Sequence, residues 1–230
     1  MYEDVPKRLA VVRERIADAA GRAGRKPEDV RLIAVSKTHP IDAVRAAADA
    51  GQQDFGENKV QEALDKIDSG LRVRWHLIGH LQSNKAKKTA AFDFVHSIDS
   101  PELLQRVDQA AAAAGRSVEV LVQVDLALEP TKHGAAIDQI PGIFRAAAQC
   151  RAARAVGLML LPPLADKPED ARPWFARLRQ VRDELAAGGV PATQLRELSM
   201  GMSHDFEVAI EEGATMIRVG TAIFGQRTYT

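Results

Sequence analysis

The sequence contains a single cysteine, Cys150, among 230 residues. A disulfide framework and a zinc site built from several thiolates are therefore excluded within one chain. Charge of one sign is also lacking, since 31 basic residues balance 31 acidic residues, so no basic surface for nucleic acid is expected. No apolar run approaches the roughly 20 residues of a membrane helix, and residues 1–30 lack the apolar stretch of a signal peptide. We expect a cytoplasmic protein with no membrane or nucleic-acid partner.

Strand-like and helix-like segments alternate along the chain, in which 46% of residues are apolar and 27% are charged. Residues 4–23 have apolar positions at helical spacing, and residues 31–37 (RLIAVSK) form a short apolar run typical of a buried strand. Further strand-like runs begin near residues 54, 73, 93, 118, 156, 195 and 215. Helix-like stretches lie between the strand-like runs, at 41–50, 58–69, 84–91, 101–114, 137–149, 169–187 and 204–212.

This alternation predicts parallel strands joined by helical crossovers. Eight strand-like runs in about 200 residues are typical of a (β/α)8 TIM barrel, at the small end of its size range. We therefore predict an α/β fold with one domain over residues 1–230: an additional N-terminal helix within 1–25 and a barrel over 31–225. The alternative is an open doubly wound sheet, which normally has fewer strands, and no G-x-G-x-x-G follows the first run.

Lys37 is the most informative residue under this prediction. Active sites of such barrels lie at the carboxyl ends of the strands, and Lys37 ends the first strand-like run. Burial disfavours the charged form of an amine, and a neutral amine can form a Schiff base with a carbonyl compound. The alternative is a lysine that extends from the strand end to the solvent.

Small residues mark the ends of the last two strands. The segment SMGMS (199–203) precedes the helix-like stretch at 204–212, and GTAIFG (220–225) follows the eighth strand. Loops at these two positions often bind phosphate in TIM barrels, because glycines let backbone N–H groups approach the anion. Together with a Schiff-base lysine, they favour a carbonyl ligand that carries a phosphate, and pyridoxal 5′-phosphate (PLP) fits that description. Taken singly, each segment is equally consistent with a tight turn.

Several long motifs resemble the pyridoxal-phosphate homeostasis protein family, whose barrel is similar to the N-terminal domain of alanine racemase. The matching segments, spread over residues 34–225, are AVSKTHP, DFGENKVQE, WHLIGHLQSNK, KHG and LSMGMSHDFEVAIEEGATMIRVGTAIFG. The sequence departs from the family at Lys59, where tyrosine is usual.

The resemblance implies a function and a set of ligand residues. Lys37 would hold PLP as an internal aldimine, in a protein of intracellular PLP (vitamin B6) homeostasis. Arg218 would lie near the pyridine ring, where a permanent charge disfavours a protonated ring nitrogen and weakens the electron sink. The full set of implied cofactor-binding residues is Lys37, Asn58, His76, Ser199, Met200, Gly201, Arg218, Gly220 and Thr221.

The sequence favours a carrier of PLP over an enzyme. Two-base racemisation needs a second acid or base, and the only tyrosines are Tyr2 and Tyr229. The chain also ends soon after the eighth strand-like run, and related racemases supply that tyrosine from a separate domain. We therefore expect no catalytic residues, no dedicated turnover and a monomer, with apo PLP-dependent enzymes as candidate recipients of PLP.

Three enzyme hypotheses remain as alternatives. The first is a PLP-dependent amino-acid racemase or lyase that uses the same aldimine. The second is an aldolase-like barrel in which Lys37 reacts directly with a sugar phosphate. The third is a metal hydrolase, suggested by the H-x-x-x-H spacing of His76 and His80; no glutamate follows the first histidine as in H-E-x-x-H, so we expect no metal.

Overall fold

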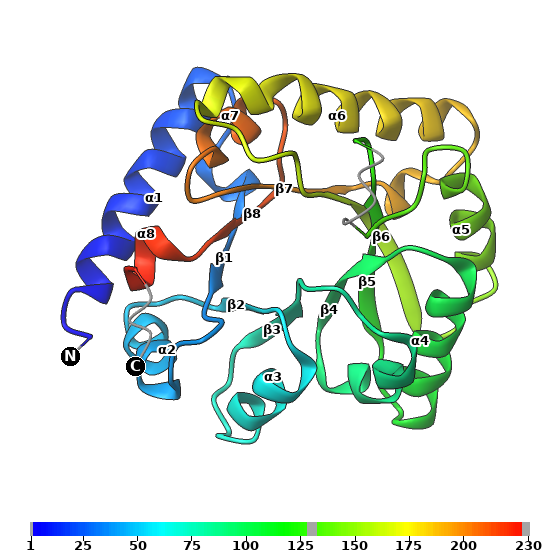
Figure 1. Cartoon of the computed structure of the whole chain (residues 1–230), viewed down its shortest axis with the longest axis horizontal. Helices are drawn as coiled ribbons and strands as arrows, with labels where there is room; N and C mark the ends of the chain where they lie inside the picture. Colours follow the sequence, from blue (N-terminus) through cyan, green and yellow to red (C-terminus); the bar gives the residue numbers. More distant parts are fainter. Residues whose placement is uncertain (1, 128–132, 227–230) are drawn as a thin grey trace.

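The computed structural model describes residues 2–127 and 133–226, in which eight parallel strands close into a barrel (Figure 1). The strands follow one another in chain order, and β8 pairs in parallel with β1. Their bounds are β1 Arg31–Val35, β2 Asp54–Glu57, β3 Arg74–Leu77, β4 Phe94–Ile98, β5 Val118–Val124, β6 Ala153–Leu160, β7 Glu197–Met202 and β8 Met216–Val219. The predicted (β/α)8 barrel is confirmed, and closure of the ladder excludes the open doubly wound sheet.

Helices surround the barrel, and the additional helix α1 packs outside it against α7 and α8 (Figure 1). The α-helices are α1 Val5–Arg22, α2 Ile41–Asp49, α3 Val60–Ile67, α4 Pro101–Ala113, α5 Ile140–Ala147, α6 Arg172–Ala187, α7 Phe206–Glu211 and α8 Thr221–Phe224. Short 3₁₀ segments are η1 Pro27–Asp29, η2 Ser83–Ala91, η3 Pro168–Ala171 and η4 Ala192–Gln194. None of the helices in the described ranges is long and apolar enough to cross a membrane.

Local sequence signals set the ends of several elements. The Ser100 hydroxyl accepts a hydrogen bond from the Leu103 N–H at 3.3 Å, and Pro101 occupies the first turn of α4, as the sequence predicts. After this helix the chain turns at Gly115, whose φ of +64° is readily adopted only by glycine. Capping at both ends therefore explains why α4 has its predicted bounds within one residue.

The crossover after β3 differs from the predicted helix at 84–91, because η2 is a 3₁₀ helix. Its buried residues are Ala86 and Thr89, three positions apart. At three residues per turn these two side chains lie above one another on the same face. The Thr89 hydroxyl also donates to the Ala86 carbonyl at 2.6 Å, which stabilises the tighter turn.

Two apolar clusters hold the fold together. A small cluster contains residues from five strands around the barrel, so it fills the interior: Ile33, Phe94, Leu121, Val156, Met159 and Met216. A much larger cluster lies between the strands and the outer helices and includes Leu104, Phe175 and Phe206. Such burial, at about 25 cal/mol per Å² of apolar surface, is the main favourable term in folding. The strands that lead to the cavity are therefore packed on both of their faces.

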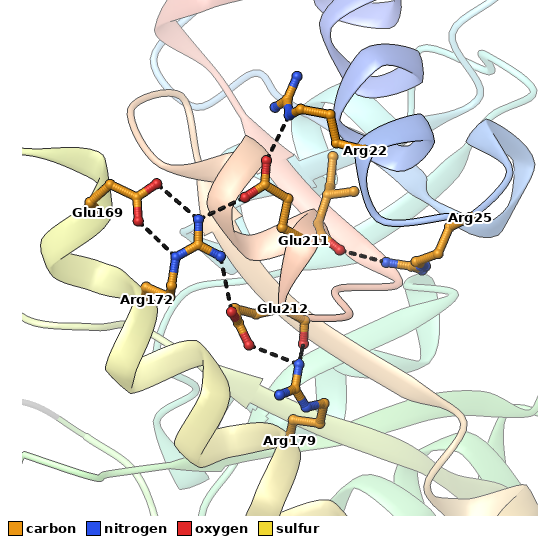
Figure 2. A network of polar contacts seen from close by, with 8 residues as sticks. Arg22, Arg25, Glu169, Arg172, Arg179, Glu211 and Glu212 are labelled. Carbon is orange, nitrogen blue, oxygen red and sulfur yellow. Dashed lines mark hydrogen bonds and ion pairs between the residues drawn. The ribbon is translucent and has the colours of Figure 1, made fainter.

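An ion-pair network joins α1, η3, α6 and α7 on the outside of the barrel (Figure 2). The Arg172 guanidinium contacts Glu169, Glu211 and Glu212 at 2.7–2.9 Å, and Arg22 of α1 contacts Glu211 at 2.8 Å. Three carboxylates around one guanidinium raise the pKa of Arg172. The network therefore fixes α7, the helix that follows β7, against its neighbours.

Candidate functional site

A cavity of about 580 Å³ opens at the carboxyl ends of the strands, as expected for a barrel of this class. Polar side chains and small residues dominate its wall. The lining residues are Val35, Lys37, His39, Asn58, Ile78, Gly79, His80, Gln123, Val124, Asp125, His133, Leu161, Met202, Ser203, His204, Arg218, Gly220, Thr221 and Gly225.

Lys37 lines this cavity from the turn between β1 and α2. It is half-buried and lies two residues beyond Val35, the last residue of β1. The next residue, Thr38, has a φ of +67°, which is rare for a β-branched residue. The Thr38 N–H donates a hydrogen bond to the Glu62 carboxylate of α3, which supports this unusual backbone. The sequence placed Lys37 at the end of the strand, and the structure places it in the turn that follows.

Asn58 reaches the cavity directly after β2. Its backbone lies so close to Gly79 that a Cβ at residue 79 would stand 2.2 Å from the Asn58 carbonyl oxygen. Only glycine permits this approach, because atoms separated by that distance overlap. The glycine in the segment LIGH therefore lets the ends of β2 and β3 meet at the cavity wall.

Arg218 extends from β8 into the floor of the cavity. It is 4% exposed; one terminal nitrogen donates to the Ser199 hydroxyl at 2.6 Å, and the other donates to the Leu160 carbonyl at 2.9 Å. Burial lowers the pKa of Arg218 to about 10, although Asp205 opposes the shift. The guanidinium is therefore still charged near neutral pH, and its orientation is fixed.

A chain of hydrogen bonds continues from Arg218 through the barrel interior. Ser199 Oγ lies 3.0 Å from His96 Nδ1, His96 Nε2 lies 2.9 Å from His76 Nδ1, and His76 Nε2 lies 2.9 Å from Asp54 Oδ1. An ionised Asp54 only accepts, so His76 Nε2–H donates to it, and a neutral His76 then accepts at Nδ1 from His96 Nε2–H. A neutral His96 in turn accepts at Nδ1 from the Ser199 hydroxyl, whose oxygen accepts from the Arg218 guanidinium. This order satisfies every group with both histidines neutral.

The electrostatics of the chain agree with that order. Burial lowers the pKa of His76, and burial together with the neighbouring His76 and Arg218 holds the pKa of His96 well below its usual value. At the far end, hydrogen bonds from His76 and Arg74 outweigh burial and lower the pKa of Asp54 to about 2. The carboxylate therefore carries the charge, and the imidazoles carry none.

The loops after β7 and β8 meet beside the cavity. The Ser203 hydroxyl accepts hydrogen bonds from the N–H groups of Gly220 at 3.2 Å and of Ala222 at 3.5 Å. A Cβ on residue 220 would stand 3.2 Å from the Val35 carbonyl oxygen, so a glycine here keeps the backbone close to β1. With both N–H groups bonded to its oxygen, the Ser203 hydroxyl can donate its own proton to an anion.

The structure brings together five of the nine residues expected to bind the cofactor. Lys37, Asn58, Arg218, Gly220 and Thr221 all line the cavity. Their contact with a ligand stays a prediction.

The other four residues, His76, Ser199, Met200 and Gly201, lie outside the cavity wall. His76 is fully buried and stacks on Phe94, with ring centroids 4.3 Å apart, so it lies inside the barrel. Residues 199–201 belong to β7, which continues to Met202, and Gly201 packs against α7. The first residue past the strand is Ser203, which lines the cavity, and the expected ligand contacts of Ser199, Met200 and Gly201 stay predictions.

Histidines contribute much of the rim, which the sequence did not predict. His39, His80, His133 and His204 line the cavity from four different loops. The rings of His80 and His133 stack with centroids 3.5 Å apart at an angle of 10°. His39, His80 and His204 follow their strands within four residues, so applying the strand-end rule to every loop would have found these three. His133 lies nine residues past the end of β5, and that rule does not reach it. Lys132 and Tyr229 lie outside the described residues.

The arrangement gives no support to the metal hypothesis. His76 contacts Asp54 and His96 inside the barrel, whereas His80 stacks on His133 at the rim. The two histidines of H-x-x-x-H therefore do not converge. Across residues 2–127 and 133–226, no three His, Cys, Asp or Glu side chains are placed to share a metal ion.

The barrel and its cavity are those of the alanine racemase class. The family model for the N-terminal domain of alanine racemase matches residues 8–228. An alanine racemase from Clostridium difficile superposes with a TM-score of 0.76 over 99% of this chain and 58% of its own, at 14% identity. That identity shows a shared fold alone.

Comparison at higher identity is more specific. The chain is 41% identical to a pyridoxal phosphate homeostasis protein of Aquifex aeolicus, over 97% of this chain and 98% of the relative. The structure of PipY from Synechococcus elongatus with PLP bound has a TM-score of 0.83 at 40% identity, and the match covers 96% of this chain and all of PipY. The chain belongs to the pyridoxal phosphate homeostasis protein family, which confirms the resemblance drawn from the motifs.

Proposed function

We propose that this protein binds pyridoxal 5′-phosphate and acts in intracellular PLP homeostasis without a dedicated catalytic reaction. The proposal rests on one observation. A single cavity is lined by Lys37, by Arg218, and by Ser203 and Gly220, which are hydrogen-bonded to each other. Support from relatives is direct, because PipY has been solved with PLP bound and the Aquifex aeolicus relative is named for PLP homeostasis.

The residues of the cavity fit each part of the cofactor. PLP would supply an electrophilic aldehyde, and Lys37 is the residue whose amine would hold it as a Schiff base. The Ser203 hydroxyl and Thr221 would bind the phosphate, and the Gly220 N–H, which donates to Ser203 Oγ, would hold that hydroxyl in place. Arg218 and Asn58 would contact the ring from the cavity wall. These residues suffice to hold the aldehyde, the ring and the phosphate of PLP.

Arg218 is also the reason to propose binding without turnover. Both of its terminal nitrogens are committed, to Ser199 and to the Leu160 carbonyl, and the side chain stays charged. A fixed cation beside the ring disfavours protonation of the ring nitrogen and so weakens the electron sink that amino-acid chemistry needs. No tyrosine of the described residues lines the cavity to act as a second acid or base.

The first test is to locate the covalent bond. We expect the purified protein to bind PLP and to show the absorbance band of a Schiff base. Reduction with borohydride should then fix the adduct on Lys37. The variant Lys37→Ala should lose that adduct, because no other lysine of the described residues lines the cavity. A reduced adduct that maps mainly to another lysine in the wild type would overturn the assignment.

The second test addresses turnover and delivery. We expect exchange of the Cα proton of D- or L-amino acids in D₂O to be no faster than with an equal amount of free PLP. The loaded protein should activate an apo PLP-dependent enzyme, and the rate should differ from that of free PLP at the same concentration. Faster Cα exchange than free PLP would favour the racemase alternative, whose fold this chain shares. The monomeric state and cytoplasmic location stay predictions from the sequence.

A further inference from the structure

A buried lysine lies behind the turn that carries Lys37. The side chain of Lys66, on α3, is only 8% exposed. Its ammonium donates to the Ser36 carbonyl at 2.8 Å, to Glu57 Oε1 at 2.6 Å and to Glu62 Oε1 at 3.2 Å. All three protons of the ammonium therefore have acceptors, which is the condition under which a lysine can be buried.

The same ammonium neutralises a carboxylate that has little other support. Glu57 is fully buried, and its Oε1 accepts from both Lys66 and the Ser36 hydroxyl, each at 2.6 Å. Its second oxygen is buried and has no hydrogen-bond partner among the described residues. Burial raises the pKa of Glu57, and the Lys66 charge opposes the shift. Without Lys66 this carboxylate would be buried and unpaired.

The contacts of Lys66, Glu57 and Glu62 hold the residues on both sides of Lys37. Ser36 is held at its carbonyl by Lys66 and at its hydroxyl by Glu57. On the other side, the Thr38 N–H donates to Glu62 Oε1, the oxygen that also binds Lys66. Both neighbours of Lys37 are therefore tied to one ammonium, and the positive φ of Thr38 shows that the turn needs such support.

We propose that Lys66 is a positioning residue that holds the residue 36–38 turn so that the Lys37 amine faces the cavity ready to react. The inference rests on the proposed function, because it concerns the same Schiff base. Preorganised side chains bind faster and tighter than mobile ones, since they lose less entropy on binding. Lys66 itself does not line the cavity and makes no contact with a ligand there.

The main test uses Lys66→Met in the full chain, which keeps the length of the side chain and removes its charge and donors. We expect PLP to bind about tenfold more weakly or worse and the borohydride-reducible adduct on Lys37 to form about tenfold more slowly. The matched control is Lys87→Met, a lysine exposed on η2, which should leave both quantities unchanged.

Two further variants separate positioning from stability. Glu62→Ala keeps the Lys66–Glu57 pair and removes the anchor of Thr38, so the adduct should form more slowly while the melting temperature stays close to that of the wild type. The double variant Glu57→Gln/Lys66→Met has no unpaired carboxylate, so it should recover thermal stability relative to Lys66→Met. It should still form the adduct slowly, because the Ser36 carbonyl has lost its donor. Glu62, which accepts from the Thr38 N–H, has also lost its ion-pair partner.

The outcomes distinguish the proposed function from the positioning role of Lys66. If the wild type forms no adduct on Lys37, the proposed function fails. If the wild type forms it, but Glu62→Ala and the double variant bind PLP with wild-type affinity and rate, Lys66 is merely structural and this inference is overturned. Glu62→Ala and the double variant also provide the test if Lys66→Met does not fold.

Discussion

Ser199 and Ser203 lie on the same segment of chain but have different partners. The Ser199 hydroxyl is buried between Arg218 and His96, whereas Ser203 lines the cavity and accepts from the Gly220 N–H. The first serine therefore supports the residue expected beside the ring, and the second borders the place expected for the phosphate. At the scale of single residues, these two roles can be separated by the choice of ligand.

We predict that Ser203→Ala weakens binding of PLP by about tenfold, the effect of losing about 1.4 kcal/mol of a hydrogen bond to a charged group. Binding of pyridoxal, which lacks the phosphate, should change little. Ser199→Ala should instead weaken binding of both compounds by similar factors, because it loosens Arg218. Absorbance titrations with the two aldehydes measure the four affinities. Equal losses of affinity for PLP and pyridoxal in Ser203→Ala would contradict this division of roles between Ser203 and Ser199.

The sequence identified residues with suitable chemistry better than it identified the full set of residues that line the cavity. Lys37 could be predicted from its place after an apolar strand, whereas Arg218 was implied by the resemblance to the family; both residues line the cavity. Ser203 was missed because apolar and small residues continue past Ser199, and nothing in that pattern shows that β7 runs on to Met202. The stacked rings of His80 and His133 depend on loops that meet only in three dimensions.

At the scale of whole elements, the Arg172 network connects helices that the barrel ladder does not connect. Arg172 is the shared partner of Glu169, Glu211 and Glu212, so its loss affects several contacts at once (Figure 2). In contrast, among the described residues Arg177 pairs only with Glu184 of its own helix α6. The two arginines form a matched pair for measuring what a connection between elements contributes.

We predict that Arg172→Met lowers the free energy of unfolding by about 1 kcal/mol at low salt, a value above that of a typical isolated surface pair. The loss should shrink as salt is added, because the contacts are partly exposed and are screened. Arg177→Met should change stability by only a few tenths of a kcal/mol. Urea denaturation at two salt concentrations measures both variants. If Arg177→Met lowers the free energy of unfolding more than Arg172→Met does, the ion pairs between helices contribute no more than a pair within one helix.

Elements with a clear period were predicted, and single-turn elements were not. The eight strands are short apolar runs, and helices such as α4 have a helical period and capping residues, so both kinds of element can be located from the sequence. The short helix α8 has only four residues, which is too few to show a period. The 3₁₀ form of η2 likewise depends on the contact between Thr89 and Ala86, which no periodicity reveals.

At the scale of the whole molecule, the barrel encloses two histidines that cannot easily take up a proton. His76 and His96 are fully buried, and the pKa of each is lowered chiefly by burial. In the unfolded chain both would titrate near the ordinary histidine pKa of about 6.5. Below that pH the unfolded state therefore binds more protons than the folded state, so acidification must favour unfolding.

We predict that the free energy of unfolding falls as the pH drops below about 6.5, with each buried histidine contributing a slope of up to about 1.4 kcal/mol per pH unit. The contribution is fully present above 6.5 and is lost towards the lowered folded pKa values. Glu57 acts in the opposite sense, because its raised pKa makes the folded state take up a proton first, at pH values above its ordinary pKa.

The variant His96→Gln isolates the histidine contribution, because it removes one titrating ring from the buried chain. We expect it to be less stable than the wild type at pH 7.5, since glutamine cannot reproduce both hydrogen bonds, but to lose stability less steeply between pH 6.5 and 5.5. Urea denaturation of the apo protein at each pH gives the slopes. Equal slopes for His96→Gln and the wild type would mean that His96 takes up a proton in the folded barrel, which would contradict a chain of neutral imidazoles from Arg218 to Asp54.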